Sequence, residues 1–153
     1  MTNNDVLRRL RYTFGYTDSK MISFFKLADV DVSRAEVSDW LKPDEDEAFV
    51  ELEDKMLAVF LNGLIIDKRG KREEPQPETE TYINNNDVLK KLKIAFELKS
   101  EDIIELYQLA GKKVSKHELS SFLRRPTQPQ YRELMDQYLR NFLYGLQLKY
   151  KKK

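Results

Sequence analysis

Apolar residues recur every three or four positions along most of the chain, and no segment alternates apolar and polar residues over the length of a strand. This spacing places apolar side chains on one face of an α-helix. The pattern predicts four helices in the first half of the chain, over residues 4–14, 19–29, 34–42 and 46–67. The fold class is therefore predicted to be all-α.

The same pattern occurs twice, without a gap, at a constant offset of 82 positions. The segment Asn3-Asn4-Asp5-Val6-Leu7 reappears as Asn85-Asn86-Asp87-Val88-Leu89. Roughly a third of the aligned positions are identical, which indicates two copies of one structural unit. A copy of about 66 residues is only marginally stable alone. We therefore expect two tandem four-helix repeats docked with pseudo-two-fold symmetry.

The repeat sets the expected domain boundaries. Helical repeat 1 is predicted over residues 1–69 and helical repeat 2 over 85–150. Residues 70–84 form an acidic linker, because their prolines and like charges favour an extended, solvated path. Residues 151–153 form a basic tail.

Polar residues that satisfy the first backbone N–H groups of a helix mark where helices begin. Ser33 with Glu36, and Ser115 with Glu118, form capping boxes at the start of the third helix of each copy. Asparagine, aspartate and serine are also good N-caps. The remaining predicted caps are Asn4 and Asn86 for the first helices and Asp18 or Ser100 for the second helices.

Gly63 and Gly145 lie inside the predicted fourth helix of each copy. Glycine there costs about 1 kcal/mol relative to alanine. Close approach of another helix is the simplest compensation, so both glycines are predicted at helix crossings, with a crossing between the copies as one option.

Composition suits a soluble protein. The chain has 153 residues, 41% of them hydrophobic and 35% charged, and it has no cysteine. No apolar run approaches the roughly 20 residues of a membrane span, and the N-terminus lacks the apolar segment of a secretory signal. We expect a cytoplasmic protein without a disulfide framework.

The net charge of +1 conceals an asymmetry. Residues 1–70 carry 10 Lys/Arg and 14 Asp/Glu, whereas residues 86–153 carry 15 and 8. A basic second copy is typical of a surface that faces a polyanion. Mutual attraction of two docked copies explains the same split.

The residue types of common catalytic sites are sparse. His117 is the only histidine and has no partner at metal or catalytic spacing. The chain has no glycine-rich phosphate loop and no nucleophile elbow. The run Asp44-Glu45-Asp46-Glu47 could bind a metal ion, but the helix dipole also stabilises acids at the start of a helix. We predict no enzymatic activity, no metal site, no cofactor and no identifiable small-molecule substrate.

The second and third helices of each copy resemble a helix-turn-helix, with Val114 to Leu123 as the turn and recognition helix of copy two. The outward residues of that helix are expected to include His117 and Ser121. The predicted nucleic-acid contacts are Lys116, Ser120, Arg124 and Arg125, with Lys90, Lys91 and Lys93 as auxiliary phosphate contacts. The turn lacks the usual glycine at Lys113 and is about two residues longer than the motif. A capped helical hairpin produces the same pattern without DNA.

A protein partner is the alternative, because aromatic residues concentrate at interfaces. The chain has aromatics beyond those that its helical stripes require: Tyr12, Tyr16, Phe24, Tyr131, Tyr138 and Tyr144. They mark either an exposed patch or a core.

Several blocks resemble one bacterial family along essentially the whole chain. The opening block is Asn3 to Tyr12, and later blocks are Trp40-Leu41-Lys42, Phe60 to Ile65 and Leu89 to Phe96. They are similar to the YehS-like family of duplicated small cytoplasmic proteins, a domain of unknown function. The resemblance implies a duplicated fold and carries over no reaction, cofactor or site residue.

Overall fold

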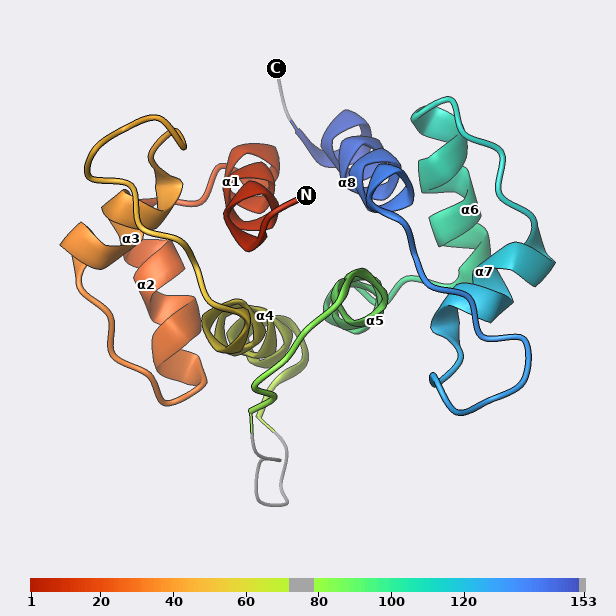
Figure 1. Cartoon of the computed structure of the whole chain (residues 1–153), viewed down its shortest axis with the longest axis horizontal. Coiled ribbons are helices and arrows are strands. Elements are labelled where there is room, and N and C mark those ends of the chain that lie inside the picture. Colours follow the sequence, from red (N-terminus) through yellow and green to blue (C-terminus); the bar gives the residue numbers. More distant parts are fainter. Residues whose placement is uncertain (72–78, 152–153) are drawn as a thin grey trace. The chain divides into compact units, whose positions relative to one another are not determined.

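The computed structural model describes residues 1–71 and 79–151, which contain eight helices and no strand (Figure 1). The chain divides into unit 1, Met1–Ile83, and unit 2, Asn84–Lys153. The helices of unit 1 are α1 (Asn3–Phe14), α2 (Asp18–Leu27), α3 (Arg34–Leu41) and α4 (Asp54–Arg69). Those of unit 2 are α5 (Asn85–Ala95), α6 (Ser100–Leu109), α7 (Lys116–Leu123) and α8 (Asp136–Tyr150). The all-α class with four helices in each half is confirmed.

Parts of the predicted linker and basic tail, residues 72–78 and 152–153, lie outside the described residues. Across the described part of the chain, each helix is too short or too polar to cross a lipid bilayer.

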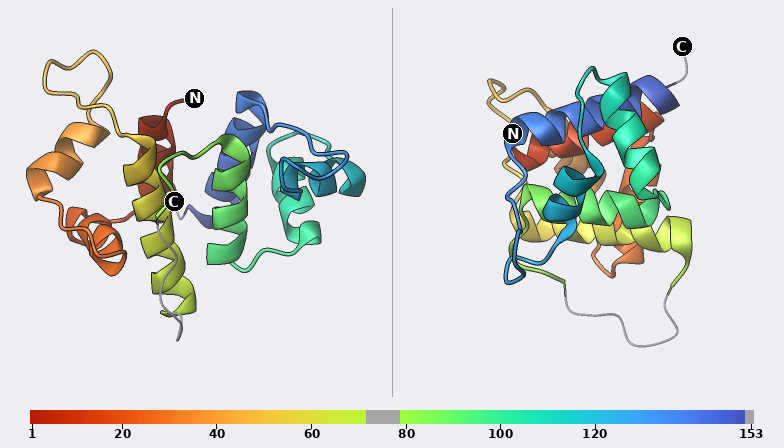
Figure 2. Two further views of the ribbon diagram at one scale, coloured as in Figure 1. Left: turned by 60° about the horizontal axis from the view of Figure 1, so that its bottom comes forward. Right: turned by 90° about the vertical axis from the view of Figure 1, so that its right-hand side faces the viewer.

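The fourth helix of each unit begins later than predicted. α4 begins at Asp54 rather than near residue 46, and residues 42–53 form a loop. Residues 124–135 form the equivalent loop before α8, and Figures 1 and 2 show both as irregular segments. The apolar pattern extends into these residues, but several of their backbone groups form hydrogen bonds with an asparagine side chain instead of within a helix.

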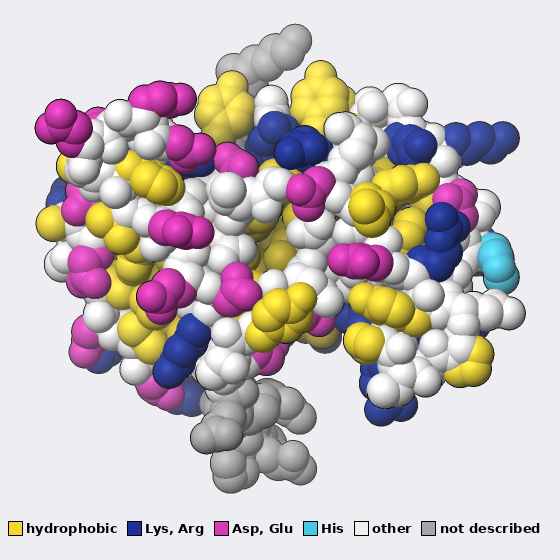
Figure 3. Space-filling model, viewed as in Figure 1, with side chains coloured by type: hydrophobic (Ala, Val, Ile, Leu, Met, Phe, Trp, Pro, Cys, Tyr) yellow, Lys and Arg dark blue, Asp and Glu magenta, His cyan; other side chains and the backbone are white. Residues whose placement is uncertain are grey.

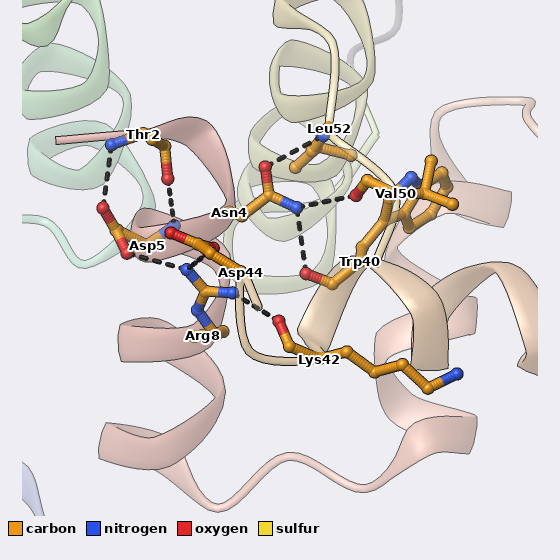
Figure 4. Close-up of polar contacts among 9 residues, drawn as sticks. All are labelled: Thr2, Asn4, Asp5, Arg8, Trp40, Lys42, Asp44, Val50 and Leu52. Carbon is orange, nitrogen blue, oxygen red and sulfur yellow. Dashed lines mark hydrogen bonds and ion pairs between the residues drawn. The ribbon is translucent and has the colours of Figure 1, made fainter. Parts of the chain in front are cut away.

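A buried asparagine holds each loop. The Asn4 side chain is inaccessible to solvent and lies one helical turn before Leu7 on the buried face of α1. Its Nδ2 donates to the carbonyl oxygens of Trp40 (2.9 Å) and Val50 (3.0 Å). Its Oδ1 accepts the backbone N–H of Leu52 at 2.9 Å (Figure 4). One amide therefore joins the end of α3 to two residues of the loop, whose backbone groups bond to Asn4 rather than within α4.

Asn86 makes the same three contacts in unit 2. Its Nδ2 donates to Phe122 O (3.0 Å) and Arg132 O (2.9 Å), and its Oδ1 accepts from Leu134 N at 2.8 Å. The prediction that Asn4 and Asn86 are N-caps is therefore wrong, because both lie inside their helices and bond to distant backbone groups. The residues that cap α1 and α5 are Thr2 and Asn84.

The predicted capping boxes of α3 and α7 are confirmed. Ser33 Oγ accepts from Glu36 N at 3.0 Å, and Glu36 Oε1 accepts from Ser33 N at 3.0 Å. Ser115 and Glu118 exchange the equivalent bonds at 3.0 and 3.2 Å. The predicted caps of the second helices are wrong by one residue: Asp18 and Ser100 begin α2 and α6, and Thr17 and Lys99 occupy the N-cap positions.

The two helical glycines lie at crossings within their own units. A Cβ atom added to Gly63 would lie 1.7 Å from the carbonyl oxygen of Phe24 on α2. One added to Gly145 would lie 2.1 Å from Leu106 O on α6. The predicted close approach is confirmed, and its partner is the second helix of the same unit rather than the other copy.

The cores of the two units differ at one pair of aromatic residues. In unit 1, Phe25 packs on Trp40 with ring centroids 5.4 Å apart. The equivalent residues of unit 2 are Tyr107 and Phe122, both buried. The Trp40 indole is thus replaced by the smaller Phe122 ring, and Phe25 is replaced by Tyr107. The Tyr107 hydroxyl is buried, and no described residue hydrogen-bonds to it.

We expect Tyr107→Phe to leave stability unchanged or to raise it by about 1 kcal/mol, because it removes a buried hydroxyl that lacks a protein partner. Burial raises the pKa of the Tyr107 phenol above its ordinary value of 10.0, with a further contribution from Tyr138. The unfolded chain therefore loses this proton first, and wild-type stability falls as pH rises above about 10. Urea unfolding at pH 7 checks the substitution, and a large loss of stability in Tyr107→Phe would contradict it. Urea unfolding of the wild type at pH 7 and pH 10.5 checks the pH dependence, and equal stability at the two pH values would contradict that.

Candidate nucleic-acid interface

The predicted contact residues of α7 lie at the surface of unit 2. Lys116 and Ser120 are exposed and one helical turn apart. Arg125 is exposed just after the helix. Lys116 Nζ lies 3.6 Å from Glu101 Oε1, and the two side chains are 74% and 69% exposed. An ion pair this exposed contributes little to stability, so it holds Lys116 only weakly.

Arg124 and Lys90 are brought together by the end of α7. Arg124 is the C-cap residue of α7, and its carbonyl oxygen accepts a hydrogen bond from Lys90 Nζ at 3.0 Å. The helix dipole also stabilises a cation at the C-terminus of a helix. Lys91 and Lys93 follow on α5, and both are partly exposed. Lys90 therefore has a structural partner while its ammonium keeps two further N–H donors.

The side chain of Arg124 is half-buried, and its Nε is buried without a hydrogen-bond partner among the described residues. In unit 1 the equivalent Lys42 pairs with Asp39. The residue equivalent to Asp39 is Ser121, which was expected to face outward. That expectation is wrong: Ser121 is buried, and its hydroxyl donates to His117 O at 3.1 Å. His117 is exposed, as expected.

The connection between α6 and α7 differs from that of a helix-turn-helix. It spans residues 110–115, whereas the motif joins its helices through about three or four residues. Its left-handed residue is Gly111 (φ 78°), at the start of the connection and two residues before Lys113. The hairpin presents α7 at the surface, but the turn geometry of the motif is absent from this described segment.

Unit 1 shows how its own acids neutralise the equivalent cations. Arg8, equivalent to Lys90, donates to Lys42 O (2.6 Å), Asp5 Oδ1 (2.8 Å) and Asp44 Oδ1 (3.1 Å) (Figure 4). Burial alone would lower the pKa of Arg8, but its hydrogen bonds to Asp5 and Asp44 raise it. Burial opposes ionisation of Asp5, but hydrogen bonds from Thr2 and Arg8 hold its pKa below the usual value. Arg8 is thus surrounded by groups of its own unit.

Unit 2 has lost most of these acids. Five acids that form ion pairs in unit 1 have neutral or basic equivalents in unit 2: Asp18 becomes Ser100, Asp31 becomes Lys113, Asp39 becomes Ser121, Asp44 becomes Pro126 and Asp67 becomes Lys149. Three of their basic partners are kept as cations, namely Lys90, Lys93 and Arg124. On the face drawn in Figure 3, acidic side chains are dense over unit 1 and sparser over unit 2.

Lys113 is a candidate contact that the sequence prediction missed. It is exposed in the α6–α7 connection at the position equivalent to Asp31 of unit 1. The signal was present in the aligned copies, where an acid that pairs with Lys26 is replaced by a base. Position-by-position comparison of charges between the copies therefore finds an exposed cation that lies outside α7.

The acidic loop of unit 1 has structural roles. Asp44 pairs with Arg8, and Asp46 Oδ1 accepts the backbone N–H of Ala48 at 2.9 Å. Within residues 1–71 and 79–151, no three acids or histidines are grouped so that they could hold a metal ion.

Comparisons with known proteins agree with the duplicated fold. A family model described as "Protein of unknown function (DUF1456)" matches the chain twice in tandem, over residues 3–70 and 85–152. The chain is 41% identical over 147 residues to "Uncharacterized protein YehS" of Escherichia coli (strain K12), a match that covers 95% of this chain and 94% of that protein. No solved structure matches the chain. The two tandem matches, which cover most of its length, show that the chain belongs to the DUF1456 family.

Proposed function

We propose that the protein is a non-enzymatic nucleic-acid-binding protein and that unit 2 contacts the phosphate backbone through α7, the loop after it and α5. The observation that carries this proposal is the selective loss of acids between two copies of one fold. Unit 2 keeps the cations at positions 90, 93 and 124, whereas their acidic partners of unit 1 are replaced at positions 100, 121 and 126.

The physical consequence is a difference in what the cations can bind. In unit 1 the carboxylates of Asp18, Asp39 and Asp44 already lie beside the cations. A nucleic-acid phosphate would have to displace them. In unit 2 the same positions offer cations to an external anion, and sequence-independent phosphate contact supplies most of non-specific affinity for nucleic acids. Because the α6–α7 connection departs from the helix-turn-helix, the proposal concerns backbone binding rather than base readout.

Fluorescence anisotropy with a labelled duplex and a labelled single strand tests the proposal. We expect binding at about 50 mM salt that weakens steeply toward about 200 mM salt, because neutralised phosphates release counterions. Replacing Lys116 and Arg124 together by alanine should weaken binding about tenfold and reduce the salt slope by about 2. The thermal transition of this variant should match that of the wild type.

The two copies supply a matched control. Arg34→Ala with Lys42→Ala removes the same number of charges from the equivalent positions of unit 1, and we expect affinity within about twofold of the wild type. Equal weakening by both double variants would show that only net charge matters, and a wild type that does not bind at low salt would end the proposal.

A protein partner is the second candidate, favoured by exposed apolar side chains. Tyr144 and Leu148 lie one turn apart on α8 and are 43% and 46% exposed, and Tyr12 is 55% exposed. The other predicted aromatics divide between environments: Phe24 is buried, while Tyr16, Tyr131 and Tyr138 are half-buried. Binding through these groups should vary little with salt, which separates the two candidates.

A further inference from the structure

We propose that unit 2 has an anion site at the Lys90 ammonium, which receives a phosphodiester group of a nucleic-acid backbone at the position where unit 1 places the Asp44 carboxylate. The phosphodiester assignment rests on the proposed function; the anion site itself does not. Its geometry comes from unit 1, in which one residue of the chain already acts as the bound anion.

The loops that carry positions 44 and 126 follow the same course. In unit 1, Asp46 N donates to Pro43 O, Phe49 N to Asp46 O and Val50 N to Asp39 O, at 3.0, 3.0 and 3.2 Å. In unit 2, the residues 82 positions later repeat these bonds: Gln128 N to Arg125 O, Tyr131 N to Gln128 O and Arg132 N to Ser121 O, at 2.9, 3.3 and 3.1 Å. Position 126 therefore stands to position 90 as position 44 stands to position 8.

The cations at positions 8 and 90 also stand alike. Arg8 Nη1 donates to the carbonyl oxygen of residue 42, and Lys90 Nζ donates to that of residue 124. Arg8 uses its second terminal nitrogen for Asp44, at 3.1 Å. Pro126 brings no carboxylate to Lys90, so the ammonium keeps donors for an anion at that point.

The charges carried by this loop and by α5 favour binding of an external phosphate. Arg125 is exposed in the same loop, and its equivalent in unit 1 is the uncharged Pro43. Asp87, the equivalent of Asp5, remains as an opposing charge, and its Oδ2 accepts from Asn84 N at 3.1 Å. Lys90 and Arg125 against one acid suit an anion with several acceptor oxygens.

The test introduces the missing carboxylate. Pro126→Asp in the full chain restores the acid of unit 1, and we expect it to pair with Lys90 and exclude the external anion. Thr127→Asp is the matched control, because it adds the same charge one residue later. Its equivalent, Glu45, is exposed and forms no ion pair within the described part of unit 1.

Inorganic phosphate is the first probe, at constant ionic strength, with backbone amide shifts of Lys90, Arg125 and Gln128 followed by NMR. The wild type should give saturable shifts there, which Pro126→Asp weakens about fivefold and Thr127→Asp less than about twofold. Asp44→Asn should create phosphate-dependent shifts at Arg8. Equal effects of the two aspartates, or no saturable shift in the wild type, would overturn the site.

A labelled oligonucleotide is the second probe and identifies the source of the phosphate. Pro126→Asp should weaken its binding more than Thr127→Asp does. If only the inorganic phosphate responds, the phosphodiester assignment is wrong while the anion site stands. If the wild type does not bind the oligonucleotide at low salt, the proposed function fails, and the phosphate titration still decides the site.

Discussion

Gly63→Ala is expected to destabilise unit 1 by about 3 kcal/mol or more, because the new methyl group would meet a backbone carbonyl rather than a movable side chain. The added Cβ would lie 1.7 Å from Phe24 O, so α2 and α4 would have to separate. In a helix without a close neighbour the same substitution stabilises by about 1 kcal/mol. The sign of the change in stability therefore shows whether α2 and α4 cross closely at Gly63.

Trp40 is the only tryptophan and lies in the core of unit 1, so its fluorescence during urea unfolding reports on this unit. Asn62→Ala is the control, since its side chain is half-buried at the position just before the crossing in the same helix. Gly145→Ala should destabilise unit 2 by a similar amount, and circular dichroism during urea unfolding measures this change. An unchanged or raised midpoint for Gly63→Ala would contradict the close crossing.

Asn4→Ala is expected to cost about 4 kcal/mol in unit 1. The substitution leaves three backbone groups without their partner, namely Trp40 O, Val50 O and Leu52 N. Each buried group that loses its hydrogen bond costs about 1–3 kcal/mol. Asn4→Asp should be no better, because a carboxylate accepts from Leu52 but cannot donate to the two carbonyls.

Asn3→Ala is the control within the same dipeptide. Asn3 is half-buried, and its hydrogen bonds to Leu52 O and to Asp54 Oδ1 are both only partly buried, so we expect a loss of about 1 kcal/mol. Proteolysis of the loop over residues 42–53 provides a second measurement, because this loop should become susceptible in Asn4→Ala. Equal losses for Asn3→Ala and Asn4→Ala would show that the buried amide has no special role.

Local signals in the sequence were sufficient to predict four helices in each half and the capping boxes of α3 and α7. Ser33 and Glu36 bond over three residues, so spacing alone reveals them. The late start of α4 was not predictable in this way. It depends on Asn4 hydrogen-bonding to residues 46 and 48 positions later, and apolar periodicity carries no information about such distant partners.

The candidate site was predicted as a set of cations without their surroundings. Sequence spacing indicated that Lys116 and Ser120 share an exposed side of α7. It did not show that Lys90 reaches the carbonyl of Arg124 or that Ser121 turns inward, since both depend on how α5 and α7 pack. Likewise, the glycine in α4 indicated a close approach, but only the tertiary fold identifies Phe24 as its partner.

The buried asparagine of each unit fixes the two ends of its loop, and none of its three hydrogen bonds is to the residues at the tip. Residues 44–48 and 126–130 are exposed throughout, and their sequences, Asp-Glu-Asp-Glu-Ala and Pro-Thr-Gln-Pro-Gln, share no residue at any aligned position. Because the anchoring asparagines bond to backbone atoms only, they place no direct requirement on the side chains of residues 44–48 and 126–130. We therefore expect that segments of new sequence placed at residues 44–48 or 126–130 will leave the asparagine anchors and the helices in place.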